Sequence, residues 1–97
     1  MLVEYQNTAG QINSTTCPTK QAFLQLMNSL KTYTTHYFQV AVGSSETIGL
    51  PATTRCLLMV HRANDSVGIM LAYPETSSTK VYKSALTSGG WSDWIEM

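Results

Sequence analysis

Residues 55–62 read Arg-Cys-Leu-Leu-Met-Val-His-Arg, and this stretch decides the fold. Its apolar side chains fall into both alternating sets: Cys56, Leu58 and Val60 in one, Leu57 and Met59 in the other. A strand that is apolar on both sides is typical of the middle of a sheet, where each face is covered. We therefore place residues 55–62 in the centre of a β-sheet.

The neighbouring segments alternate with a period of two, which is the pattern of a strand with one buried side. In residues 36–42, one side of the expected strand carries His36, Phe38, Val40 and Val42, and the other side carries Tyr37, Gln39 and Ala41. Strands are also expected at 67–73, 80–86 and 91–96, with loops or turns at 43–51, 64–66, 74–79 and 87–90. Such short connections join antiparallel neighbours, because a parallel crossover needs about a dozen residues or more. The sequence thus predicts an antiparallel meander.

One helix is expected before the strands, over about residues 18–30. Its apolar positions recur at i, i+3, i+4 and i+7: Phe23, Leu26, Met27 and Leu30. Leu24 widens this stripe to one side, Pro18 suits the first helical turn, and residues 14–19 offer candidate N-caps. The apolar stripe must cover one face of the sheet.

The chain of 97 residues is long enough for one domain. Residues 1–16 are interpreted as an entering segment or linker, and residues 17–97 as the domain. The predicted class is α+β, a mostly antiparallel β-meander or small sandwich with one N-terminal helix. A single helix covers one face of a meander, so the other face is either buried inside a small sandwich or covered by a neighbouring subunit. Both arrangements agree with the pattern.

The charge and the apolar runs of the sequence argue against two kinds of partner, nucleic acid and membrane. Six basic and six acidic side chains give a formal net charge of zero, and charged residues make up only 12% of the chain. Nucleic acid is not an expected partner, because nothing here would neutralise a phosphate backbone. The longest apolar run, residues 56–60, is too short to cross a bilayer, and no secretion signal opens the chain. Membrane insertion is therefore not expected.

The sequence offers few residues suited to binding a metal or cofactor or to catalysis. Cys56 and His61 are five apart on a strand, so their side chains leave opposite faces and cannot chelate one ion. Cys17 and Cys56 are expected to be free thiols, with a single bridge as the alternative. No nucleophile elbow or phosphate loop occurs, and the carboxylates fall in turns and termini. We expect no metal, no cofactor and no enzymatic activity.

Nine aromatic residues remain, and several lie where strands meet loops. Aromatic rings stack on sugar faces, and neighbouring polar groups hold the hydroxyls. The candidate ligand contacts are Tyr37, Arg55, Arg62, Asp65 and Tyr82. Trp91 and Trp94 are expected to be structural and, being three apart on a strand, to point to opposite faces. Trp94 is further expected to anchor the end of the chain.

The ending Val81-Tyr82-Lys83-Ser84, followed by Gly89-Gly90-Trp91-Ser92-Asp93-Trp94-Ile95, resembles a known closing motif. It is similar to that of the pyocin-knob type of domain in bacteriophage and pyocin tail fibres. The resemblance covers residues 33–97 and includes Ile48-Gly49-Leu50-Pro51. Family members often carry Arg where Lys83 stands, and Lys cannot replace Arg in bidentate recognition of a carboxylate or phosphate.

This resemblance implies a knob domain over residues 17–97 in a virion tail, assembled in the bacterial host cytoplasm without disulfides. Its partners would be a bacterial cell-surface polysaccharide and either two further copies, as a homotrimer, or other fibre subunits. The expected function is a non-enzymatic receptor-binding adhesion module. The alternatives are a purely structural trimerisation or attachment module and, third, a small glycan-modifying enzyme.

Overall fold

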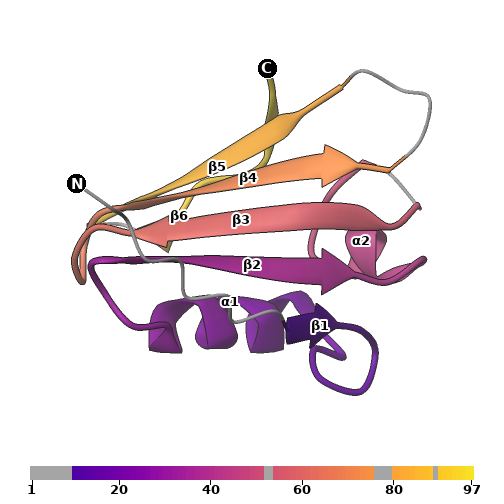
Figure 1. Cartoon of the computed structure of the whole chain (residues 1–97), viewed down its shortest axis with the longest axis horizontal. Coiled ribbons are helices and arrows are strands. Elements are labelled where there is room, and N and C mark those ends of the chain that lie inside the picture. Colours follow the sequence, from indigo (N-terminus) through magenta and orange to yellow (C-terminus); the bar gives the residue numbers. More distant parts are fainter. Residues whose placement is uncertain (1–9, 52–53, 76–79, 89) are drawn as a thin grey trace, which may run out of the picture.

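The computed structural model describes residues 10–51, 54–75, 80–88 and 90–97. It consists of one mostly antiparallel sheet and two short helices, which confirms the α+β meander (Figure 1). The long strands are β2 (Thr34–Val40), β3 (Cys56–Arg62), β4 (Gly68–Pro74) and β5 (Tyr82–Thr87). The short strands are β1 (Gly10–Ile12), β6 (Gly90–Trp91) and β7 (Ile95–Glu96), and the helices are α1 (Lys20–Ser29) and α2 (Ser44–Thr47).

The strands follow the order β1-β2-β3-β4-β5, and both β6 and β7 pair with β5. All neighbours are antiparallel except β1, which runs parallel to β2. β3 pairs along its full length with β2 on one side and with β4 on the other. The predicted position of residues 55–62 in the middle of the sheet is confirmed.

The first strand corrects the expected linker. Ile12 pairs with Val40 and is fully buried, as is Cys17, and the Ala41 amide donates to the Ile12 carbonyl at 2.9 Å. Residues 10–16 therefore belong to the domain, and the linker prediction is wrong for them. A strand of three residues with one buried apolar side chain is too short for an alternating pattern to reveal it. Residues 1–9 of the predicted segment lie outside the described residues, as do positions 76–79 and 89 of the predicted turns.

Helix α1 is close to its prediction and begins two residues later. Thr19 is the N-cap, and its hydroxyl accepts a hydrogen bond from the Ala22 amide at 3.1 Å. Pro18 therefore precedes the cap instead of lying in the first turn. Phe23 and Met27 are buried, and Leu24, Leu26 and Leu30 pack partly buried against the core. The apolar stripe covers the sheet as expected.

We call the side of the sheet against α1 the covered face. It consists of His36, Phe38, Val40, Cys56, Leu58, Val60, Arg62, Gly68, Met70, Ala72, Tyr82, Ser84 and Leu86, all buried. The predicted loop at 43–51 contains α2, and its Ile48 and Leu50 are buried in the same core. Val42, predicted on this face, lies beyond the end of β2 and is exposed.

We call the opposite side the open face. It carries Thr35, Tyr37, Gln39, Leu57, Met59, His61, Ile69, Leu71, Tyr73, Lys83 and Ala85. None of them is buried, and no described helix covers them. No described element buries this face inside a sandwich, and its cover by a neighbouring subunit stays a prediction.

On β4, Ile69, Leu71 and Tyr73 point to the open face, whereas the side toward α1 carries Gly68, Met70 and Ala72. At Gly68 a Cβ would come within 2.9 Å of the His61 carbonyl and 3.2 Å of the Trp91 ring. Trp91 thus occupies space on the covered face that a side chain at position 68 would fill. The result is an open face richer in apolar surface than an ordinary solvated sheet face.

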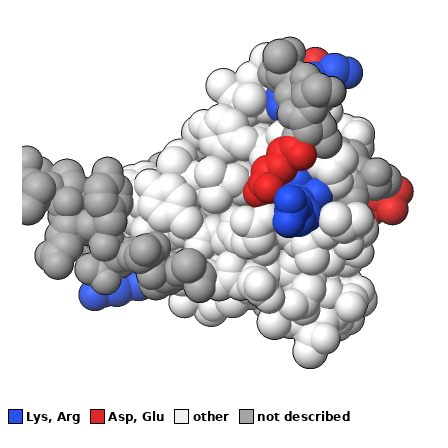
Figure 2. Space-filling model, turned by 45° about the vertical axis from the view of Figure 1, so that its right-hand side comes forward, with Lys and Arg blue, Asp and Glu red and all other residues white. Residues whose placement is uncertain are grey.

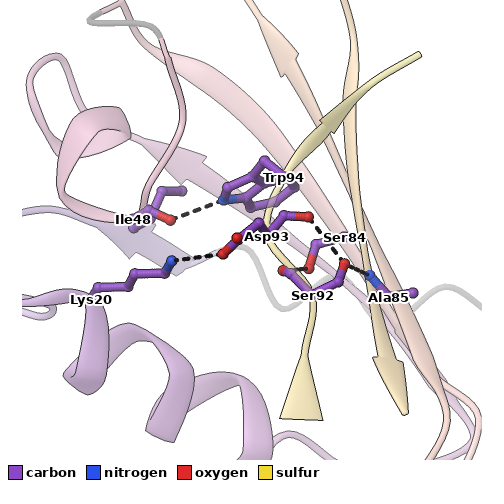
Figure 3. Close-up of polar contacts among 7 residues, drawn as sticks. All are labelled: Lys20, Ile48, Ser84, Ala85, Ser92, Asp93 and Trp94. Carbon is purple, nitrogen blue, oxygen red and sulfur yellow. Dashed lines mark hydrogen bonds and ion pairs between the residues drawn. The ribbon is translucent and has the colours of Figure 1, made fainter. Parts of the chain in front are cut away.

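The C-terminal residues Gly90–Met97 form a segment along β5 that closes the covered face (Figure 3). Between β6 and β7, Ser92, Asp93 and Trp94 oppose only Ser84 and Ala85, which is the arrangement of a β-bulge. The Ser84 hydroxyl donates to the Ser92 carbonyl at 2.6 Å, and the Ala85 amide donates to the Ser92 hydroxyl at 3.1 Å. Two serines therefore complete the ladder where the bulge interrupts it.

The bulge also corrects the expected orientation of the tryptophans. Its extra residue brings Trp91 and Trp94 to the covered face together, so the prediction of opposite faces is wrong. The Trp91 indole donates to the Asn28 side chain at 3.1 Å, and the Trp94 indole donates to the Ile48 carbonyl at 2.9 Å. Both rings pack against the core. Trp94 ties the end of the chain to the loop after α2, the anchoring expected of it (Figure 3).

Replacing the central side chain of α1 tests this packing. Phe23→Ala removes a fully buried ring and should lower the free energy of unfolding by about 3–5 kcal/mol. Gln25→Ala, on the exposed side of the same helix, should change it by less than about 0.5 kcal/mol. Urea denaturation followed by circular dichroism measures both. Equal effects of the two substitutions would contradict the assignment of the buried side of α1.

Candidate functional site

The five candidate contact residues lie in different environments. Tyr37 is half-buried on the open face, Arg55 is exposed just before β3, and Asp65 is exposed in the turn between β3 and β4. Arg62 and Tyr82 are only 2% and 6% exposed, on the covered face. The expectation that these two are surface groups is wrong.

Arg62 has a structural role. Its guanidinium donates to the Met27 carbonyl at 2.7 Å and to the Asn64 carbonyl at 3.3 Å, and its Nε has no partner among the described residues. Carbonyl groups in the last turns of a helix attract a cation. Arg62 thereby connects β3 to the end of α1. Its burial was readable from the sequence, because position 62 is in phase with Cys56, Leu58 and Val60.

Arg55 and Asp65 do not share a site. They lie at opposite ends of β3, and a strand of this length spans roughly 23 Å at about 3.3 Å per residue. The same end of the sheet as Asp65 carries Tyr33, which is 80% exposed and adopts a left-handed φ of 62°. Tyr37 is level with Met59, four positions along β3 from Arg55, which is about 13 Å, so these two predicted contacts are not brought together either.

A group of residues around Arg55 comes together only in the folded chain and is not apparent from the sequence. Glu75 accepts a hydrogen bond from the Gln39 side chain at 2.8 Å, and its other oxygen lies 3.6 Å from Nη2 of Arg55. Leu57 stands between them, paired in register with Gln39 on β2 and with Tyr73 on β4. We call Gln39, Arg55, Leu57, Tyr73 and Glu75 the corner cluster. It combines an apolar floor with a row of three planar polar groups.

The middle of the open face is apolar. Met59 and Leu71 are register partners at its centre, with Tyr37 on one side and Lys83 on the other. Ile69 lies in the next row and is exposed. Figure 2 shows charged side chains as small separate groups on a mostly uncharged surface. The open face is therefore a continuous, weakly charged surface that ends in the corner cluster.

The thiols do not resemble a nucleophilic site. Cys17 and Cys56 are both free and buried. Burial raises the pKa of the Cys56 thiol to about 11, an effect that a hydrogen bond from Ser45 opposes and the charge of Glu75 reinforces. A catalytic cysteine needs the opposite shift, toward an accessible thiolate. His61 lies on the other face of the sheet and bonds to the Thr35 hydroxyl at 2.9 Å, so it cannot serve Cys56 as a base.

Two further features of the described chain bear on function. No group of three or more His, Cys, Asp or Glu side chains is placed to hold a metal ion within the described ranges. In those same ranges no helix has the length and apolar character to cross a membrane.

Comparison with known proteins adds no relative. No family model, no curated protein and no solved structure matches the chain. The resemblance of the closing motif to pyocin-knob domains therefore stays a prediction.

The buried thiol gives stability a specific pH dependence. In the unfolded chain Cys56 ionises near its ordinary pKa of 9.0, whereas the folded chain keeps its proton up to about 11. The folded state thus binds more protons between these values, and the free energy of unfolding should fall by up to about 1.4 kcal/mol per pH unit. Cys56→Ala should lose this part of the slope. Urea denaturation of both proteins between pH 8 and 11 measures it, and parallel curves would contradict the shift.

Proposed function

We propose that the protein is a non-enzymatic adhesion module of a phage or phage-like tail fibre, and that it binds a bacterial surface glycan with its open face. The observation that carries this proposal is the uncovered sheet face itself. It joins exposed tyrosine and aliphatic side chains to uncharged or mutually paired polar groups. Ligand-binding surfaces of this composition suit sugars, whose rings have an apolar face and a rim of hydroxyls.

Weak binding of a sugar chain by each single domain is compatible with this function. An open sheet face is shallow, so one sugar chain would make few contacts with one domain. When several domains are tethered in one fibre, their effective concentration raises the total affinity without any new contact. A fibre of three such domains in the virion tail, assembled in the host cytoplasm, is the arrangement that the closing motif suggests.

Binding to bacterial polysaccharide tests the adhesion proposal. The wild-type domain, displayed on beads at high density, should retain purified surface polysaccharide of a susceptible host. Tyr37→Ala should reduce retention at least fivefold, because it removes an aromatic side chain from the open face. Asp65→Ala, in the exposed turn at the far end of β3, should leave retention unchanged.

If Tyr37→Ala and Asp65→Ala reduce the retention of polysaccharide equally, binding at the open face is contradicted. Absence of retention of any bacterial polysaccharide by the wild-type domain would contradict the adhesion function. Thermal unfolding of each variant shows whether the fold is intact.

A second function, structural attachment or trimerisation within the fibre, is favoured by the centre of the open face. Met59, Ile69 and Leu71 form an apolar patch there with no cover from the described chain. Monomeric proteins seldom expose large continuous apolar patches, and such patches usually mark an interface. Two further copies of this chain, or another fibre subunit, would cover it.

Molar mass in solution tests this second function. Light scattering should give a mass above the 10.7 kDa of one chain, rising with protein concentration. Ile69→Lys should return the mass to that of a monomer, because it places a charge in the apolar patch. Gln25→Lys on α1 adds the same charge elsewhere and should have no effect. A monomeric wild-type protein at millimolar concentration would contradict self-association.

A further inference from the structure

We infer that the corner cluster is the sugar-binding subsite of this domain, and that it takes a neutral pyranose with adjacent free hydroxyls, not an anionic sugar. This inference rests on the proposed adhesion function and makes it more specific.

The floor of the cluster is formed by Leu57 and Tyr73. They are register partners on β3 and β4, and they are 40% and 39% exposed. Opposed residues in antiparallel strands have Cβ atoms about 5 Å apart, so the two side chains make one continuous surface. A pyranose ring is of this size and has an apolar face of axial C–H groups. Stacking on the tyrosine ring with an edge over the leucine would desolvate that face.

The polar row borders this floor. Gln39 flanks Leu57 on the β2 side. Arg55 directly precedes β3 and Glu75 directly follows β4, and the Glu75 amide donates to the Arg55 carbonyl at 2.8 Å. The carboxylate of Glu75 accepts from Gln39 with one oxygen and faces Arg55 with the other. A carboxylate has about four acceptor positions, so both oxygens keep capacity for a second donor. Adjacent sugar hydroxyls would donate to these oxygens and accept from the amide and guanidinium.

The contacts within the row also fix its geometry before a ligand arrives. Gln39 and Arg55 hold the Glu75 carboxylate from two sides, although Arg55 and Glu75 remain partly exposed, with side-chain exposures of 60% and 37%. An exposed ion pair contributes little to stability, about 0–1 kcal/mol. The ion pair matters here because it holds the Arg55 and Glu75 side chains in a fixed orientation. A side chain that is already oriented loses less conformational entropy on binding than a free one.

Charge selects between neutral and anionic sugars. The positive charge of Arg55 lies 3.6 Å from the negative charge of Glu75, so the cluster has no net charge. A uronic acid or sugar phosphate would have to displace Glu75 from Arg55 and would meet the carboxylate at close range. Lys83 pairs in register with Leu71, lies diagonally from Tyr73 and forms no ion pair with another described residue. Recognition of an anionic sugar would therefore depend on Lys83 and on salt.

A polysaccharide panel with the full chain tests this inference. The panel contains dextran and mannan as neutral polymers, polygalacturonate as an anionic one, and purified neutral and acidic surface polysaccharides from bacteria. We expect the wild-type domain to bind a neutral polymer with an affinity that changes less than twofold between 50 and 500 mM NaCl. Glu75→Gln should weaken this binding about tenfold, and Tyr73→Ala at least tenfold.

Each variant has a matched control in the same chain. Glu46→Gln changes an exposed carboxylate on α2, and Tyr33→Ala removes an exposed tyrosine at the other end of the sheet. Both should bind like the wild type. Glu75→Gln changes a single atom of an exposed side chain, so it tests the site even where Tyr73→Ala lowers stability.

The possible outcomes distinguish a failure of the proposed subsite from a failure of the adhesion function. Binding of no polysaccharide by the wild-type domain overturns both. Binding only of acidic polymers, weakened by salt and by Lys83→Gln, overturns the inference and leaves the adhesion function in place. Neutral binding that Glu75→Gln and Tyr73→Ala leave unchanged also overturns the corner cluster as the subsite.

Discussion

One helix of ten residues has to cover a sheet built from four long strands, and this constraint determines the rest of the structure. A helix with side chains is about 10–12 Å wide, whereas four strands at about 4.8 Å spacing are wider. Helix α1 therefore leaves part of even one face uncovered. Ile48 and Leu50 from the loop around α2, together with Trp91 and Trp94, complete that face. Nothing in the described chain is left to cover the other side.

The segment Gly90–Met97 completes the covered face, and its packing restricts which residues can occupy other positions of the chain. Both tryptophans have to point toward α1, and residues three apart on a regular strand cannot do so. The bulge at Ser92 and Asp93 supplies the extra residue, and the Ser84 and Ser92 hydroxyls replace ladder contacts that the bulge removes. Gly68 has to lack a side chain, because a Cβ there would come within 2.9 Å of the His61 carbonyl and 3.2 Å of the Trp91 ring. The Trp91-Ser92-Asp93-Trp94 part of the ending is thus explained by packing.

The sequence predicted the meander and the central strand because these depend on local periodicity, which is complete in residues 36–42, 55–62 and 67–73. It did not predict β1, which is recognisable only by its partner β2, or the common direction of the two tryptophans, which depends on pairing with β5. The corner cluster was missed for the same reason. Gln39 and Glu75 are 36 residues apart, and only the register of β2, β3 and β4 brings them together. Arg62 differs, because its phase with Cys56, Leu58 and Val60 on β3 indicates the buried side, although the sequence was interpreted as placing it at the surface.

The two candidate roles of the open face do not compete for the same residues. Its apolar centre is formed by Met59, Ile69 and Leu71, whereas the corner cluster lies at the end of the sheet where β2 and β4 finish and β3 begins. An interface concentrates its binding energy in a desolvated centre and keeps a polar, wet rim. If copies of this chain met through the centre, the paired polar side chains of the cluster would fall at the rim. There they would stay accessible to a sugar chain, and each added copy would bring a further cluster to the same assembly.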